Sequence, residues 1–484
     1  MLIRIFLFRL SALVFTTLVL TACGTDSGPE AIPPVLNLPS KIDAIVGQPV
    51  DYTINVTDPQ DLETELLVEG LPAWLEYVPA TKSLQGTPVE GDDGRFELTI
   101  TAQNSVSGIT ATTELRVFTS MRELQLQENL ERFVSMTTPG LLGISIAVVD
   151  ADGTLYTAYT GHMGTSTASP KIQKNSLFRV ASVTKPMTTA ILLKLAEEGR
   201  LNLSDRFHDH YPSAMPNGDI MTIRQMLSHT AGIFDHLNAS SFWGHPSRTP
   251  TKVWSIDEII GFAATNGSRF SPGAAYGYSN TGFCALGGII EGMTEQSLRE
   301  AFDSVLFDPL GLEESVYDDF SGASNTIENL AFNSRSYEYH LSSACAAGAV
   351  AATASDVARF GWHLYGGRYV DASLSGLMSE NIGARLGGSN YGLGTRIWTV
   401  AGIPHHGHTG ALMDYRNILM YIPSLDISIA MHTHQVHSGW FPLTDDVFEY
   451  VVDNFTEKRV NKLPRFMWEG ESRWTEYERN ARWQ

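Results

Sequence analysis

The fold of this chain is decided by one stretch, Phe178-Arg179-Val180-Ala181-Ser182-Val183-Thr184-Lys185, which leads into an apolar run. Apolar residues recur after it at helical spacing, namely Met187, Ile191, Leu192 and Leu195. Pro186 fixes the start of the helix near Ser182, because proline is tolerated only in the first turn, and Gly199 ends the run. The pattern predicts a buried amphipathic helix that opens at Ser182.

The serine and the lysine of this stretch are three residues apart. That spacing puts both side chains on one face of the first turn, where the Lys185 amine can reach the Ser182 hydroxyl. The unpaired N–H groups at a helix N-terminus would also stabilise an oxyanion. The alternative is that Ser182 only caps the helix and Lys185 is solvated. Since about one such spacing is expected by chance in a chain of this length, other motifs have to decide.

Composition limits the classes of protein. The chain has 484 residues, of which 43% are hydrophobic and 18% charged, so it is an ordinary globular protein with room for two or three domains. Its formal net charge of −20 argues against nucleic acid or an anionic membrane surface as a partner, because both require basic patches.

The amino terminus indicates export. Arg4 and Arg9 precede an apolar stretch, Leu10 to Leu20, that is too short to span a bilayer. Leu20-Thr21-Ala22-Cys23 resembles the lipobox of bacterial lipoproteins, in which the cysteine is acylated and becomes the first mature residue. We therefore expect residues 1–22 to be a signal peptide and Cys23 to carry a lipid anchor. Gly24 suggests the outer membrane of the bacterial cell envelope.

Two cysteines remain in the mature chain, Cys284 and Cys345. Both lie in small, apolar surroundings, and nothing in the sequence brings their Cα atoms within bridging distance. We expect buried free thiols here.

Residues 23–119 read as an all-β segment. Alternating runs at Val50 to Val56, Arg95 to Ala102 and Thr110 to Val117 are separated by turn residues, which predicts a small β-sandwich. The stretch around Trp74 resembles the immunoglobulin-like domains of bacterial surface proteins, and this resemblance implies a tryptophan in the core and a possible surface partner. Asp58 and Asp61 also resemble calcium-binding turns, but two acidic residues in a turn usually form only the turn.

From Met121 onward the pattern is mixed α/β. A helix to about Phe133 precedes a strand pair, Leu142 to Val149 and Thr154 to Tyr159, around an Asp-Gly turn. The segment from about Leu203 to Asn333 is rich in helices, and strands return before Ile429. A helical insertion within a sheet domain predicts a cleft where the two meet.

A second motif, Tyr278-Ser279-Asn280, precedes a glycine-rich apolar helix. A nearby lysine ammonium favours the phenolate form of Tyr278, which would let the tyrosine carry protons at neutral pH. The Asn280 amide can hydrogen-bond a substrate carbonyl and hold the lysine. A purely structural role for both is the alternative.

A third motif is His408-Thr409-Gly410-Ala411. On a strand edge, Gly410 would let a substrate backbone lie close, and the Ala411 N–H would complete an oxyanion hole with that of Ser182. A metal interpretation of the histidines is disfavoured because neither group has helical His-x-x-x-His spacing or a carboxylate-rich partner. The histidines concerned are His405, His406, His408, His432, His434 and His437.

Together these motifs resemble the serine β-lactamase and penicillin-binding protein superfamily, in the branch of class C β-lactamases, D,D-carboxypeptidases and esterases. Further motifs follow in family order: Leu227-Ser228-His229-Thr230-Ala231-Gly232-Ile233, Pro309-Leu310-Gly311-Leu312 and Ala351-Ala352-Thr353-Ala354-Ser355-Asp356-Val357-Ala358-Arg359-Phe360. The resemblance implies an α/β (α+β) β-lactamase-like transpeptidase fold at residues 120–455, an antiparallel sheet flanked by helices with an all-helical subdomain. Residues 456–484 stay unassigned.

The resemblance also implies roles for the motif residues. Ser182 would form an acyl-enzyme, and Lys185 and Tyr278 would exchange its proton. Asn280 would orient the acyl group, and the amides of Ser182 and Ala411 would bind the oxyanion. No metal or organic cofactor is implied.

One departure from the family bears on the substrate. Many β-lactamases have lysine where this chain has His408, and a histidine is often neutral near pH 7. The sequence His408-Thr409-Gly410 resembles the D,D-peptidase and esterase side of the family, and this resemblance implies D-amino-acid peptides, as in peptidoglycan, or small esters as substrates more than β-lactams. A class C-like β-lactamase and a surface binding protein without turnover stay open as alternatives.

Overall fold

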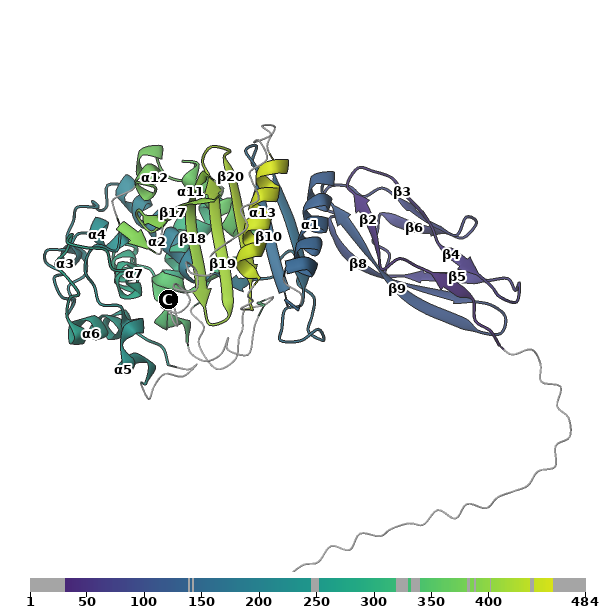
Figure 1. Cartoon of the computed structure of the whole chain (residues 1–484), viewed down its shortest axis with the longest axis horizontal. Helices are drawn as coiled ribbons and strands as arrows, with labels where there is room; N and C mark the ends of the chain where they lie inside the picture. The colour runs from purple at the N-terminus through teal and green to yellow at the C-terminus, as the bar shows by residue number, and fades with distance from the viewer. Residues whose placement is uncertain are drawn as a thin grey trace, which may run out of the picture. The chain divides into compact units, whose positions relative to one another are not determined.

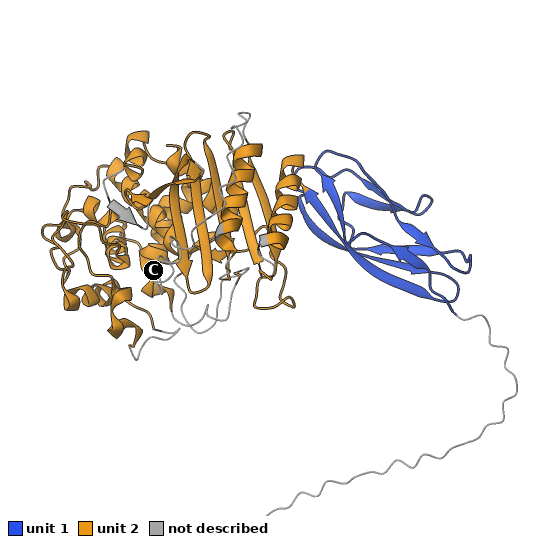
Figure 2. Cartoon of the chain, in the orientation of Figure 1, with its two compact units in different colours: residues 1–117 blue, residues 118–484 orange. Residues whose placement is uncertain are grey.

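The computed structural model describes residues 31–455 except 138–139, 142, 245–251, 319–329, 332–339, 381–383, 387–388, 401 and 436–438. The predicted signal peptide, Cys23, His437 and the carboxy-terminal extension at 456–484 therefore lie outside the described residues. The chain divides into two compact units, residues 1–117 and 118–484 (Figure 2). None of the helices in the described part combines the length and apolar character needed to cross a bilayer.

The first unit is entirely β in its described part. A four-stranded sheet has the order β2-β9-β8-β5, a three-stranded sheet the order β3-β7-β6, and β1 pairs with β4. The strands are β1 Val35–Asn37, β2 Lys41–Ile45, β3 Val50–Thr53, β4 Asn55–Thr57, β5 Glu65–Glu69, β6 Leu75–Val78, β7 Ser83–Gly86, β8 Gly94–Gln103 and β9 Gly108–Phe118. The run predicted at Val50 to Val56 is thus two strands, because the chain changes sheets at the buried Ile54.

The alternation of apolar residues places the core of this unit. On β8, Leu98, Ile100 and Ala102 are fully buried, whereas the residues between them are partly exposed. Trp74 differs from the expectation, since it packs against this core while staying partly exposed. Asp58 closes a turn, because its Oδ1 accepts from the backbone N–H groups of Gln60 and Leu62.

The second unit is built on an eight-stranded sheet in which every neighbouring pair is antiparallel (Figure 1). Its order is β11-β10-β20-β19-β18-β17-β16-β15. The bounds are β10 Gly143–Val149, β11 Leu155–Gly161, β15 Ala384–Leu386, β16 Ser389–Tyr391, β17 Arg396–Val400, β18 Ile403–Leu412, β19 Tyr415–Ile422 and β20 Ile427–Thr433. The predicted hairpin is confirmed as β10 and β11, and the expected fold class is confirmed.

Helices cover both faces of this sheet. Ile144, Ile146 and Val148 of β10 pack toward α1 (Met121–Thr137) and α13 (Trp440–Asn454), which lie over one face (Figure 1). Ala147 and Val149, which point the other way, join a larger core with α2, α7 and α11. Because both faces are covered, all seven residues of β10 are buried.

The helical region between β11 and β15 carries most of the site. A three-stranded sheet of order β12-β14-β13 lies in the same part of the chain. The bounds are β12 Phe178–Arg179, η1 Ala181–Val183, α2 Thr184–Glu197, α3 Phe207–His210, α4 Ile223–Leu227, η2 His236–Asn238, α5 Ser240–Trp243, α6 Ile256–Asn266, α7 Asn280–Thr294, α8 Leu298–Phe302, η3 Asp303–Phe307, α9 Asp308–Leu310, β13 Ser315–Tyr317, η4 Leu341–Ser343, α10 Cys345–Gly348, β14 Val350–Ala352, α11 Ala354–Tyr365 and α12 Ala372–Met378.

Candidate active site

Ser182 lies on a single 3₁₀ turn between β12 and the buried helix α2. Ala181 has a left-handed backbone, with φ of 53°, which turns the chain sharply before the serine. Ser182 is partly exposed, whereas its neighbours Ala181 and Val183 are buried. The predicted helix is therefore confirmed, with a 3₁₀ start that presents the hydroxyl.

The Lys185 amine has three hydrogen-bond partners. It contacts Ser182 Oγ at 3.0 Å, Asn280 Oδ1 at 2.8 Å and the Ala347 carbonyl oxygen at 2.8 Å. The amide and carbonyl oxygens can only accept, so they take the two N–H groups of a neutral amine and leave its lone pair toward Ser182.

The charge state of this amine is set by burial. Desolvation lowers the pKa of Lys185 from 10.5 to about 7, and the negative charge of Asp235 acts in the opposite direction. About half of the lysine is therefore neutral near pH 7, as a general base requires.

Tyr278 completes the contacts of the serine. Its hydroxyl donates to Ser182 Oγ at 3.1 Å, and its ring centroid lies 4.9 Å from Lys185 Nζ. Ser279 accepts from Gly282 N and so caps α7, which puts Asn280 in the first turn of that helix. The structure thus brings Ser182, Lys185, Tyr278 and Asn280 together.

His229 holds the tyrosine loop from both sides. Its carbonyl oxygen accepts from Gly277 N at 2.8 Å, and its ring Nδ1 accepts from Ser279 N at 3.2 Å. The His229 ring also lies 4.2 Å from the Tyr278 ring, measured between centroids. The sequence singled out the surrounding motif but assigned this histidine no role.

The third motif lies on β18 where that strand runs past its neighbour. β17 pairs with β18 only from Ile403 to Gly407, so the edge from His408 onward has no β17 partner. Gly410 is needed for a backbone contact, because an added Cβ would lie 2.1 Å from the Val180 carbonyl oxygen. This contact fixes β18 against the turn that carries Ser182, whereas the sequence pointed to a close approach of substrate.

His408 is buried and neutral. Its Nδ1 donates to the Thr409 carbonyl at 2.6 Å, and its Nε2 then accepts from the Tyr391 hydroxyl at 3.0 Å. Burial and the charges of Lys185 and Arg396 lower the pKa of His408 well below its usual range. This position therefore supplies no cation.

Arg396 is the cation beside this motif, and the sequence analysis did not find it. Arg396 is 2% exposed, and its guanidinium donates to Thr409 Oγ1 at 2.6 Å and to Ser389 Oγ. Because Thr409 Oγ1 accepts from Arg396, its own hydroxyl proton is available to a ligand. An isolated arginine in a strand has no motif signal that would have revealed it.

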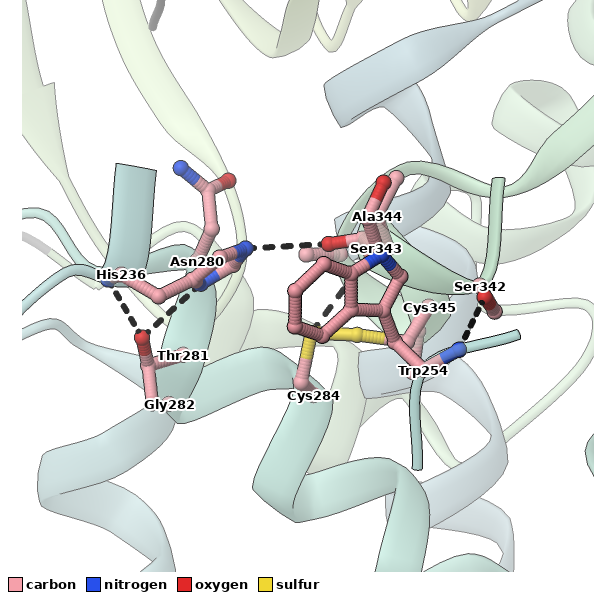
Figure 3. Close-up of a disulfide and its surroundings, with 12 residues drawn as sticks. His236, Trp254, Asn280, Thr281, Gly282, Cys284, Ser342, Ser343, Ala344 and Cys345 are labelled. Atoms are coloured by element: carbon pink, nitrogen blue, oxygen red, sulfur yellow. Dashed lines mark hydrogen bonds between the residues drawn. A yellow bond between two sulfur atoms is a disulfide. The ribbon is translucent and has the colours of Figure 1, made fainter. Parts of the chain in front are cut away.

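The expectation of free thiols is wrong. Cys284 of α7 and Cys345 of α10 form a disulfide with Cα atoms 5.3 Å apart (Figure 3). The two helices pack against each other, so cysteines 61 positions apart in sequence become neighbours.

In the same region, His236 contacts Thr281 Oγ1 and the Ser343 carbonyl, each at 3.0 Å (Figure 3). α7 carries Asn280 and α10 carries Ala347, whose oxygens accept hydrogen bonds from Lys185. The disulfide and the His236 contacts therefore hold together the two segments that carry these acceptors.

His405, His406 and His432 pack as neutral rings. Burial lowers the pKa of His405 and of His432 to about 3, and that of His406 to about 4. His405 lies against Trp398, and His432 against Phe178. Within the described ranges, no group of three or more His, Cys, Asp or Glu is arranged to hold a metal ion.

Fold and site together define a serine hydrolase with a Ser-Lys-Tyr centre. The family model "Beta-lactamase" matches residues 126–451, so the chain belongs to the β-lactamase family, and the resemblance seen in the sequence is confirmed. A second model, "Putative Ig domain", matches residues 33–118.

Several known proteins are similar to the chain. Penicillin-binding protein 4 of Amycolatopsis lactamdurans is 27% identical over 339 residues, which cover 63% of this chain and 84% of that protein. The D-alanyl-D-alanine-carboxypeptidase/endopeptidase AmpH of Escherichia coli K12 is 24% identical over 183 residues, which cover 37% of this chain and 46% of AmpH. The match therefore spans less than half of AmpH.

A solved structure has the same fold. D-amino acid amidase from Ochrobactrum anthropi SV3, complexed with L-phenylalanine amide, superposes with a TM-score of 0.61 at 22% identity. The match covers 70% of this chain and 100% of the amidase. At that identity the likeness establishes the fold alone.

Proposed function

We propose that the protein hydrolyses amide or ester bonds of D-amino-acid peptides or amides through an acyl-enzyme on Ser182. The observation that carries this proposal is the position of Ser182 Oγ, 3.0 Å from Lys185 Nζ and 3.1 Å from the Tyr278 hydroxyl. A nucleophile that contacts two proton carriers is equipped for both halves of an acyl transfer.

The steps follow from these contacts. The lone pair of neutral Lys185 accepts the Ser182 proton while Oγ bonds to the substrate carbonyl carbon. The carbonyl oxygen becomes an oxyanion, which the amides of Ser182 and Ala411 would bind. Tyr278 protonates the leaving amine or alcohol as the bond to carbon breaks, and it regains a proton from Lys185. Water then attacks the ester by the reverse route and releases the acid.

The substrate class is supported by the third motif and by the relatives. AmpH and the amidase are named for D-alanyl-D-alanine and D-amino acid substrates. In this chain, the Thr409 hydroxyl is oriented by Arg396, which suits it to donate to the carboxylate or carbonyl of an extended peptide. His408 is uncharged, so the site lacks the lysine cation of many β-lactamases.

An assay panel tests the proposal. Protein lacking residues 1–23 is incubated with a D-Ala-D-Ala peptide, a D-amino-acid amide, p-nitrophenyl esters, a chromogenic cephalosporin and a fluorescent penicillin. We expect peptide, amide or ester turnover to exceed cephalosporin hydrolysis. We also expect Ser182→Ala to lose at least ~10³-fold in rate, while Ser297→Ala, which removes the capping hydroxyl of α8, keeps the parent rate.

Each other outcome identifies an alternative. Product formation by Ser182→Ala at the parent rate would refute the nucleophile. Faster hydrolysis of the cephalosporin would indicate a β-lactamase. Stable labelling by penicillin with no product from any substrate would indicate a binding protein.

We further propose that Cys23 is lipidated and anchors the protein to the bacterial cell envelope, at the outer membrane. The sequence Leu20-Thr21-Ala22-Cys23, with Gly24 after it, supports this proposal. Cys23→Ser should release the protein from the membrane fraction. Unchanged fractionation of that variant would refute the anchor.

A further inference from the structure

The orientation of the Asn280 amide matters for the lysine, because only its oxygen can accept from Lys185. Asn280 Oδ1 lies 2.8 Å from Lys185 Nζ, and Asn280 Nδ2 donates to Asp235 Oδ2 at 3.0 Å. A flipped amide would place its oxygen against the carboxylate and its NH₂ group against the amine, which costs both bonds. The Asp235 carboxylate therefore determines which end of Asn280 faces the lysine.

Asp235 is itself held rigidly. Its side chain is fully buried, and its Oδ1 accepts from Leu237 N at 3.2 Å, which caps η2. Oδ1 also lies 3.7 Å from His236 Nδ1, so this oxygen has its partners in its own turn, while Oδ2 has its partner on α7. A buried carboxylate with a fixed position is a suitable counter-charge for a buried ammonium.

The other titratable groups near Lys185 leave Asp235 as the counter-charge of the described site. His229, His236 and His408 are buried, and burial lowers the pKa of each, with the charge of Lys185 acting in the same direction. On His236 the negative charge of Asp235 acts in the opposite direction. Tyr278 contributes a hydroxyl and a ring. The negative charge of Asp235 acts on Lys185 against the effect of burial.

We propose that Asp235 is a positioning residue for acyl transfer, which locks the Asn280 amide toward Lys185 and keeps a negative charge beside the amine. The inference rests on the proposed role of Lys185 as the base for Ser182. It adds a buried residue that acts on the lysine through Asn280.

The test measures how fast Ser182 is modified by a fluorophosphonate probe between pH 5 and pH 9. This probe reacts with activated serines by displacement of fluoride, so its use does not depend on the natural acyl group. The labelling rate should fall at low pH as Lys185 becomes protonated, and we call this part of the pH profile the acid limb. In Asp235→Asn the acid limb should move to lower pH by about one unit, because loss of the negative charge beside Lys185 lowers the pKa of the amine. The plateau should fall about 10- to 100-fold, because the amide is no longer locked.

Two further variants make the result decisive. Asp235→Ser keeps a hydroxyl acceptor for Leu237 N but removes the charge, so its acid limb should also move to lower pH. Asp356→Asn is the matched control, because Asp356 is a buried carboxylate whose partners are Glu314 N and Ser315 Oγ. It should keep the parent's limb, and near-ultraviolet circular dichroism checks the fold of each variant.

The outcomes separate this inference from the proposed function. An acid limb at the parent's pH in folded Asp235→Asn or Asp235→Ser, whatever the plateau, would overturn the role of Asp235 alone. Equal labelling of the parent and Ser182→Ala would instead refute the nucleophile.

Discussion

Acidification from pH 8 to pH 6 should lower kcat/KM about tenfold, because the base must be unprotonated in the free enzyme. Burial sets the pKa of Lys185 at about 7. The neutral fraction is then roughly 90% at pH 8 and roughly 10% at pH 6. With an ordinary lysine pKa the neutral fraction at pH 7 would be roughly 0.03%, so burial raises the amount of competent base by on the order of 10³-fold.

The assay follows ester hydrolysis between pH 5 and pH 9 with a substrate that does not ionise in that range. Ser182→Ala provides the background at each pH, and overlapping buffers at constant ionic strength exclude specific ion effects. We expect a single acid limb with its midpoint near 7. A flat profile from pH 6 to pH 8, or a midpoint above about 9, would refute a lysine base made neutral by burial.

Four further predictions concern the same region. Below pH 7 Lys185 is charged in both the folded and the unfolded state, but between about pH 7 and pH 10.5 only the unfolded chain keeps the proton, so the free energy of unfolding rises with pH in that window. Urea titrations should show that this free energy, relative to Lys185→Met, rises by about 3 kcal/mol from pH 6 to pH 9. Equal pH dependence of the parent and Lys185→Met would contradict this. Gly410→Ala should cost about 1–3 kcal/mol in thermal unfolding and most of the activity, because the added Cβ meets a backbone oxygen, and an active, equally stable variant would refute that contact. Asparagine at position 229 keeps an acceptor near the position of Nδ1 and tolerates the left-handed backbone, with φ of 57°, so His229→Asn should retain a higher kcat than His229→Leu. Equal losses of kcat in the two variants would show that His229 contributes packing and not its hydrogen bond. Cys284→Ala should lower the free energy of unfolding by about 4 kcal/mol, the value for a disulfide that closes a loop of 61 residues, and should also reduce kcat. A Cys284→Ala variant as stable as the parent would show that the disulfide does not form.

Much of the fold was predictable because it depends on local patterns. The period of Met187, Ile191 and Leu195 defined α2, and the Asp-Gly turn defined the hairpin of β10 and β11. Ser182, Lys185, Tyr278 and Asn280, which the structure brings together, could be singled out because each lies in a short contiguous motif.

The missed features depend on contacts between distant segments. Arg396 meets Thr409 because β17 and β18 are neighbours, and Asp235 meets Asn280 across 45 positions. The prediction of free thiols was wrong for the same reason, since the disulfide forms only because α7 packs against α10. A lone Arg, Asp or Cys carries no periodicity, so only the tertiary structure reveals its partner.

The contact between Gly410 and the Val180 carbonyl has a consequence for how such a site diversifies. Backbone atoms set the closest approach between the strand of the third motif and the turn of the nucleophile. Asn417 of β19 reinforces this spacing by donating to the Arg179 carbonyl at 2.9 Å. Side chains around the cleft can therefore change during evolution, and with them the acyl groups accepted, while the reacting oxygen keeps its place.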